Sequence, residues 1–180
     1  MSKKILVISS SFRQGSNSDM LADRFIEGAS EAGCDAEKVT LFDKGIAFCE
    51  GCLACQNLGQ CIIEDDAVEI VEKMLHADVI VFVAPVYYYS IPGQLKTLLD
   101  RANPLFSLDY SFRQIYFLTC AAEDEESTPF GAKTAIQGWV DCFEQAEFCG
   151  TVFAGGVTAP GDIEGHPALR QAYELGKTLG

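Results

Sequence analysis

Four cysteines lie within thirteen residues of this chain, Cys49, Cys52, Cys55 and Cys61, with the spacing C-x2-C-x2-C-x5-C. Three thiols at successive x2 spacing let one tight loop surround a compact group, which the fourth thiol closes. Structural zinc sites more often join two cysteine pairs through a longer insertion. In bacterial ferredoxins the run ends in C-x3-C-P, and its fourth cysteine serves another cluster. The spacing therefore favours four thiolates on one [4Fe–4S] cluster, with zinc and metal-free thiols as alternatives.

The charge around these cysteines is negative. No Lys or Arg occurs between Lys44 and Lys73, whereas six carboxylates do: Glu50, Glu64, Asp65, Asp66, Glu69 and Glu72. A segment without cations does not stabilise a free thiolate, which argues against a redox-catalytic thiol. A metal centre would supply that stabilisation itself. If a cluster is bound, we expect the acidic segment to favour its oxidised form and a low reduction potential.

A second candidate site is the segment Ser9–Ser18, which holds five serines, Arg13, Gly15 and Asn17. It separates an apolar run from an expected helix. Helix N-terminal N–H groups, short hydroxyl side chains and one arginine suit a phosphate dianion. A simple helix cap is the alternative, although a cap needs only one or two such residues. Neither Gly-x-Gly-x-x-Gly nor Gly-x-x-x-x-Gly-Lys-Ser/Thr is present, which disfavours a dinucleotide fingerprint and a nucleotidase P-loop.

A third segment, 84–94, carries three successive tyrosines, Tyr87, Tyr88 and Tyr89, after a strongly apolar run. The three rings cannot all point inward. Aromatic faces beside backbone N–H and C=O groups suit a flat heteroaromatic ring, whereas core filling by one tyrosine is the alternative. A phosphate site and a flat-ring site on one sheet edge together indicate FMN.

Apolar periodicity predicts the elements that position these segments. The expected strands are 5–8, 35–41, 79–83, 115–118 and 151–154. The expected helices cover about 17–32, 66–76, a stretch opened by Pro92, a stretch holding 132–143, and one after Pro167. This alternation predicts a doubly wound parallel sheet in one domain, residues 1–180, with a cysteine-rich loop at about 45–65. Ligands of such sheets bind beyond the carboxyl ends of the strands, here after Ile8, Val83 and Leu118.

The motifs Ser9–Ser18 and Ala84–Arg101, together with the closing stretch Gly161–Leu169, resemble the flavodoxin-like NADPH-dependent FMN reductase superfamily. The resemblance covers nearly the whole chain and implies a five-stranded sheet of order 2-1-3-4-5 with helices on both faces. It implies phosphate ligands at Ser9, Ser11, Arg13, Ser16, Asn17 and Ser18. It implies ring contacts at Pro85, Val86, Tyr87, Tyr88 and Ser90.

The third flavin loop departs from the glycine-rich form that relatives often have and reads Thr119-Cys120-Ala121-Ala122-Glu123. Thr119 and Cys120 are its candidates for cofactor contact. The cysteine spacing resembles the compact motif of the iron–sulfur flavoproteins, a branch of the same superfamily.

The resemblance implies an oxidoreductase that moves electrons from NADPH or NADH through FMN to flavin- or quinone-type acceptors. The missing catalytic dyad is no objection, because the flavin carries the chemistry. The alternative is a non-catalytic FMN/[4Fe–4S] carrier between redox proteins such as ferredoxin, and a third is a redox-sensing regulatory protein. Turnover of NAD(P)H separates the first two.

The composition limits the partners. Thirteen Lys and Arg against 26 Asp and Glu give 180 residues a net charge of −13, which disfavours nucleic acid and anionic membranes. No apolar run approaches the roughly 18–20 residues of a membrane span. The first residues read as a strand rather than a signal peptide, so we expect a reducing cytoplasm and no disulfide framework. By resemblance we also expect a homodimer or homotetramer.

Overall fold

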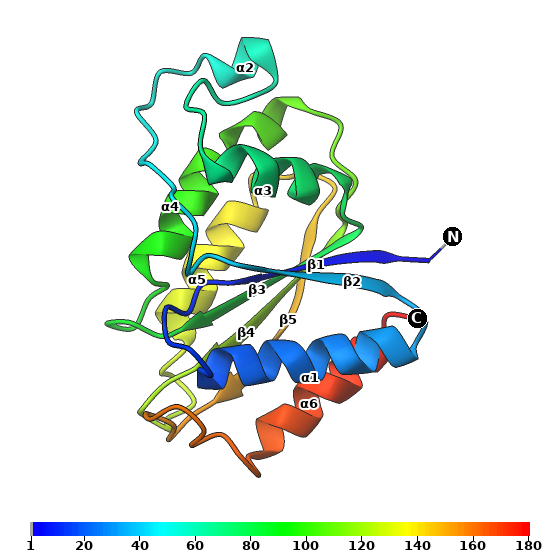
Figure 1. The fold of residues 1–180 in the computed structure, drawn as a ribbon, viewed down its shortest axis with the longest axis vertical. Helices are drawn as coiled ribbons and strands as arrows, with labels where there is room; N and C mark the ends of the chain where they lie inside the picture. The colour runs from blue at the N-terminus through cyan, green and yellow to red at the C-terminus, as the bar shows by residue number, and fades with distance from the viewer. Residues whose placement is uncertain (1) are drawn as a thin grey trace.

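The computed structural model describes residues 2–180 and contains a parallel five-stranded sheet with helices on both faces (Figure 1). The strands are β1 (Lys4–Ser9), β2 (Asp35–Thr40), β3 (Val79–Pro85), β4 (Gln114–Cys120) and β5 (Glu147–Ala154). They lie in the order β2-β1-β3-β4-β5, and every neighbouring pair is parallel. The predicted flavodoxin-like fold class is therefore confirmed.

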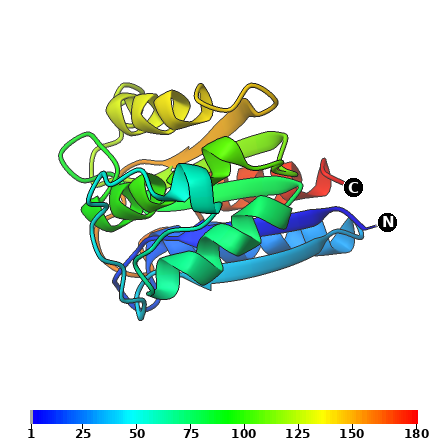
Figure 2. The same cartoon turned by 90° about the horizontal axis from the view of Figure 1, so that it is seen from above.

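Two helical layers cover the sheet. The helices are α1 (Asn17–Glu31), α2 (Cys55–Leu58), α3 (Asp66–His76), α4 (Gly93–Arg101), the 3-10 helix η1 (Asn103–Ser107), α5 (Phe130–Val140) and α6 (Pro167–Lys177). One apolar core lies between the sheet and α1 with α6, and the other lies beneath α3, α4 and α5. The short α2 packs against η1 beyond the second layer (Figures 1 and 2).

Burial on both faces explains the uninterrupted apolar runs of the central strands. In β3, Ile80 and Phe82 belong to the core under α3–α5, whereas Val79, Val81 and Val83 belong to the core under α1 and α6. Alternate side chains of one strand point to opposite faces, so both sets must be apolar.

The edge strand β5 begins four residues earlier than the predicted 151–154. Residues 147–151 of this strand are exposed or half-buried, so they carry no apolar run to reveal them.

The α1–α6 pair is unusually close because two glycines face each other across it. A Cβ atom on Gly28 would lie 2.0 Å from the Tyr173 carbonyl oxygen, and one on Gly176 would lie 2.2 Å from that of Phe25. Any side chain at either position would therefore push the helices apart.

The carboxyl ends of the strands meet at one edge of the sheet. Ser9 pairs with Val83 in the adjacent strand, and Cys120 pairs with both Pro85 and Ala154. The loops that leave β1, β3, β4 and β5 therefore lie side by side. Within residues 2–180, no helix combines the length and the hydropathy needed to cross a bilayer.

Candidate functional site

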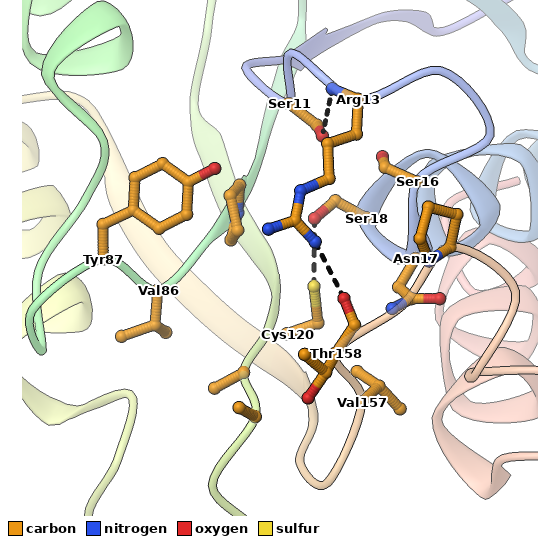
Figure 3. A pocket seen from close by; sticks show the side chains of 14 residues that line it. Ser11, Arg13, Ser16, Asn17, Ser18, Val86, Tyr87, Cys120, Val157 and Thr158 are labelled. Atoms are coloured by element: carbon orange, nitrogen blue, oxygen red, sulfur yellow. Dashed lines mark hydrogen bonds between the residues drawn. The ribbon is translucent and has the colours of Figure 1, made fainter.

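A cavity of about 220 Å³ opens among the loops at this carboxyl edge (Figure 3). Nine of the thirteen residues predicted for the cofactor line it: Ser11, Arg13, Ser16, Asn17, Ser18, Pro85, Val86, Tyr87 and Cys120. Five further residues complete the wall: Ala121, Ala122, Val157, Thr158 and Pro160. The fold thus brings together two segments that are about seventy residues apart in the sequence. We call this space the edge cavity.

One end of the edge cavity is polar and lies at the N-terminus of α1. Ser16 is the N-cap of α1, and its hydroxyl accepts a hydrogen bond from the Asp19 amide at 3.1 Å. The Ser11 hydroxyl accepts from the Arg13 amide at 3.3 Å, so its own proton is available to a ligand. Ser11, Ser16 and Ser18 are all buried. Buried hydroxyls at a helix N-terminus form a site for an anion.

Arg13 supplies the cationic group of this end. Its Nη1 atom donates to the Thr158 carbonyl at 2.8 Å, which links the loop after β1 to the loop after β5. Figure 3 shows the guanidinium reaching across the cavity between Tyr87 and the Ser16–Ser18 turn. The chain carries a net charge of −13, so a guanidinium here is a local positive charge in an acidic protein, and a guanidinium can make charge-assisted bonds to an anion.

Asn17 lines the edge cavity, but its amide is already bound to the loop after β5. It donates to the Ala159 carbonyl at 2.9 Å and accepts from the amides of Gly161 and Ile163 at 3.1 and 3.3 Å. Asp162 accepts from the Thr158 and Ala159 amides, and these bonds lower the pKa of its carboxyl. Asn17 therefore holds the wall of the cavity, and its predicted contact with a phosphate stays a prediction.

Four predicted cofactor residues lie outside the cavity wall. Ser9 and Thr119 are fully buried within strands, and their hydroxyls donate to Asp19 Oδ1 at 2.6 Å and to the Ala84 carbonyl at 2.8 Å. The structure gives these two hydroxyls internal partners, and their contact with a cofactor stays a prediction. Tyr88 and Ser90 lie in the turn beyond Tyr87 and do not reach the wall either.

The tyrosine segment is a tight hairpin turn. Tyr87 and Ser90 exchange backbone hydrogen bonds at 2.9 and 3.0 Å, and the two residues between them have φ values of 48° and 60°. Two left-handed residues are what a type I′ turn requires, although Asn and Gly adopt them more easily. The Tyr89 hydroxyl donates to Glu123, and this bond raises the pKa of the phenol. Tyr87 thereby faces the cavity, whereas Tyr88 is fully exposed, as the impossibility of three inward rings predicted.

The other end of the edge cavity is mainly apolar. Pro85, Val86 and Cys120 form its floor, and Cys120 Sγ lies 3.1 Å from the Ser18 hydroxyl. Burial raises the pKa of the Cys120 thiol, which the Ser18 bond offsets only in part. The thiol is thus neutral near pH 7 and behaves as a small apolar group.

A second cavity, of about 410 Å³, is lined by all four cysteines of the Cys49–Cys61 segment. Asp100, Arg101, Asn103 and Pro104 from α4 and η1 form its opposite wall. We call it the cysteine cavity. Left-handed residues at Gly51, Leu53 and Gly59 bend the segment around it. Among residues 2–180, no three His, Cys, Asp or Glu side chains converge as ligands of one metal ion. The thiols surround a space instead of one point.

Arg101 joins the two ends of the cysteine segment, at Ala47 and Ile63, and we call this junction the neck. Its side chain is fully buried and binds both oxygens of Asp65, at 2.6 and 2.9 Å. It also donates to the carbonyls of Ala47 and Ile63, both at 2.9 Å, on the two sides of the neck. Burial alone would raise the pKa of Asp65, but the bonds from Arg101 and from two amides lower it overall.

Arg101 lies outside the segment between Lys44 and Lys73 and was not among the predicted site residues. Burial alone would lower the pKa of Arg101, but Asp65 and the Cys61 sulfur beside the guanidinium raise it. The segment itself carries no cation, as its sequence shows, but the fold brings the guanidinium of Arg101 from α4 to the same cavity. The available signal was the Asp100-Arg101 pair that ends the second resemblance motif.

Comparison with known proteins gives a consistent result. The family described as NADPH-dependent FMN reductase matches residues 3–125. Iron–sulfur flavoprotein MJ1083 of Methanocaldococcus jannaschii is 39% identical over 102 residues, which are 57% of this chain and 53% of that protein. The iron–sulfur flavoprotein of Methanosarcina thermophila is 41% identical over 99 residues, 55% of this chain and 52% of that protein. The matches thus span about half the length of these relatives.

A solved structure shows the same fold over the whole chain. It is described as NAD(P)H:quinone oxidoreductase from Methanothermobacter marburgensis. It superposes with a TM-score of 0.77 at 20% identity and covers 99% of this chain and 96% of that one.

Proposed function

The chain belongs to the NADPH-dependent FMN reductase family, and from this premise we propose that it is an FMN-dependent oxidoreductase with NADPH or NADH as electron donor. The observation that carries the proposal is the edge cavity, which joins a buried hydroxyl and guanidinium end to an apolar end walled by Tyr87. Bound FMN would supply one- and two-electron chemistry, and the protein would supply its position and its electrostatic environment.

The polar end suits the FMN phosphate. Ser11 has a hydroxyl proton that can be donated, the N-terminus of α1 carries a partial positive charge, and Arg13 adds a charge-assisted donor. The Ser16 hydroxyl donates to Asp19 Oδ2 at 3.0 Å, so the Ser16 side chain fixes the turn. The backbone amides next to Ser16 would then bind the phosphate. Asn17 acts indirectly, because its side-chain amide holds the loop that carries Thr158.

The apolar end suits the flavin ring. Pro85, Val86 and the neutral Cys120 exclude water from one side, and the Tyr87 ring covers an edge. The Tyr89–Glu123 hydrogen bond fixes the hairpin that presents Tyr87. These residues orient the ring and keep water from it, and no general base is required of them.

We further propose that the cysteine cavity holds a [4Fe–4S] cluster. All four thiols line one cavity of about 410 Å³, and their compact C-x2-C-x2-C-x5-C spacing favours one cluster over a zinc site. Two relatives that share about two fifths of the aligned residues are named iron–sulfur flavoproteins. In that case electrons would pass from the hydride donor to FMN and from FMN to a one-electron centre.

The partners follow from charge and redox chemistry. An acidic surface suits weak, salt-sensitive docking to basic redox proteins, and a ferredoxin is the candidate we keep from the resemblance. Eight reduced cysteines fit a reducing cytoplasm, and we expect a homodimer or homotetramer of one-domain chains.

The deciding experiment is anaerobic purification followed by an absorption spectrum and assays of iron, sulfide and zinc. We expect flavin bands with about four iron atoms per chain, and NAD(P)H oxidation with a quinone acceptor. Cys61→Ser should lose iron and keep flavin, whereas the exposed Cys142→Ser should keep both. Failure to bind FMN on reconstitution would contradict the proposal. Bound FMN with electron exchange but no NAD(P)H turnover would favour the carrier alternative.

A further inference from the structure

The cysteine cavity contains hydrogen-bond donors that come from outside the cysteine segment. Asn103 Nδ2 donates to Cys55 Sγ at 3.0 Å. The Gly51 amide donates to Cys49 Sγ at 3.5 Å from within the segment. The sulfurs of Cys55 and Cys49 thus each accept one N–H hydrogen bond from the protein itself.

Arg101 contributes a third donor. Four bonds from its Nη atoms are satisfied by Asp65 and two carbonyls, but its Nε atom is buried and has no partner within residues 2–180. Arg101 and Cys61 line the same cavity, and the Cys61 sulfur lies near enough to affect the guanidinium. A buried donor without an acceptor is costly, and a Cys61 thiolate that approached Nε would satisfy it.

We propose that Arg101 and Asn103 set the reduction potential of the centre held by the four cysteines, through N–H···S hydrogen bonds to Cys61 and Cys55. The inference rests on the proposed [4Fe–4S] cluster. A reduced cluster carries one more negative charge than an oxidised one, so a donor to its sulfur ligands stabilises the reduced form more. The donors therefore raise the potential above the low value expected from the acidic segment.

The acidic residues have less influence because of where they lie. Glu50 and Glu64 are exposed, so water and salt screen their charges. Asp65 is nearer, but it is paired with Arg101 through two bonds. Asp100 also lines the cavity, but it is paired with Lys96. The N–H donors of Arg101 and Asn103 are the side-chain groups of the cavity wall that can bond to the sulfurs.

The test measures the reduction potential of the cluster in the whole, anaerobically purified chain by EPR-monitored redox titration. Asn103→Leu removes the donor to Cys55 with little change in size, and Arg101→Lys keeps the charge but removes Nε. We expect each to reduce the equilibrium constant for cluster reduction about tenfold, which is about 59 mV for a one-electron couple. Asn103→Asp should lower the potential further, because a carboxylate then faces the sulfur.

Glu50→Gln is the matched control, because Glu50 lines the same cavity but is exposed. We expect Glu50→Gln to raise the reduction potential of the cluster by much less than Asn103→Leu lowers that potential. An equal or larger shift for Glu50→Gln, or an unchanged potential in Asn103→Leu at full iron content, would overturn the inference alone. Absence of iron and sulfide from the wild-type chain would overturn the cluster and the inference together. Should Arg101→Lys fail to fold, the two Asn103 variants decide the outcome.

Discussion

The edge cavity and the cysteine cavity hold their chemical groups in different ways. In the edge cavity, Ser11, Ser16 and Ser18 are buried, and the wall opposite them is fixed by three bonds of Asn17. In the cysteine cavity, Cys49 and Cys52 are exposed, and the segment is secured mainly at its neck by Arg101.

The difference indicates two routes to a cofactor site. Under the proposed function, a phosphate and a flat ring would be bound by a surface that is already formed at the edge of the sheet, with little rearrangement on binding. A metal cluster with four thiolate bonds can itself order its ligands, because metal binding is coupled to folding. The protein then needs to supply only the ends of the loop and a few donors to the sulfurs.

Breaking the neck tests this comparison most strongly. In Asp65→Asn, Arg101 stays buried without its counter-charge, so we expect a loss of about 3–5 kcal/mol in the free energy of unfolding. Chemical denaturation of the metal-free chain measures it. The exposed pair Lys96–Asp100 is the control, and Lys96→Gln should cost less than about 1 kcal/mol. Equal losses in the two variants would contradict the role of the neck.

The same pair predicts a pH dependence. The folded-state pKa of Asp65 lies below its ordinary value of 3.8. Its contribution is therefore fully present above the unfolded pKa and is lost as the pH falls through the lower folded value. The difference in unfolding free energy between wild type and Asp65→Asn should shrink below about pH 4. A difference that stays constant from pH 7 to pH 3 would contradict this assignment.

Removing the anion-binding groups tests the edge cavity. The double variant Arg13→Ala/Ser16→Ala loses one charge-assisted donor and the N-cap that fixes the turn, so we expect FMN affinity to fall about 100-fold. Quenching of FMN fluorescence measures it. Arg24→Ala, an exposed arginine on α1, should bind FMN normally. Iron content should be unchanged in the double variant, and a parallel loss of iron would show that the two cavities are not independent.

The smallest expected effect concerns the hairpin turn. Tyr88 has a φ of 48°, which Asn tolerates better than Tyr, so Tyr88→Asn should stabilise the chain by up to about 1 kcal/mol. The change in melting temperature measures it. Tyr87→Asn serves as the control, since Tyr87 has no left-handed φ and should gain nothing. A destabilised Tyr88→Asn would indicate that the exposed ring makes a contact in the assembled protein.

Much of the fold was predictable because its determinants are local. The run Val79–Val83 is apolar throughout because both faces of β3 are buried, and its alternation with helical patterns requires a parallel sheet. The start of β5 was not predictable, because residues 147–151 are at best half-buried at the sheet edge.

The lining of the edge cavity was predictable in part. Ser9 and Thr119 belong to the predicted cofactor motifs, but they lie inside strands and outside the cavity wall, where their hydroxyls bond to Asp19 and to the Ala84 carbonyl. The bonds of Thr158 to Arg13 and of Arg101 to Asp65 were not predictable, because they are tertiary contacts across 145 and 36 residues. Spacing along the chain does not report such pairs.

The glycine contact between α1 and α6 has a consequence for the distant anion site. Gly28 follows Ser16 by twelve residues, so these two positions lie about 18 Å apart along α1. A methyl group at Gly28 or Gly176 would change the tilt of α1 relative to α6. The N-terminus of α1, at Ser16, would then move relative to the loop around Thr158. Alanine there would thus misdirect the helix without touching any group that meets the coenzyme.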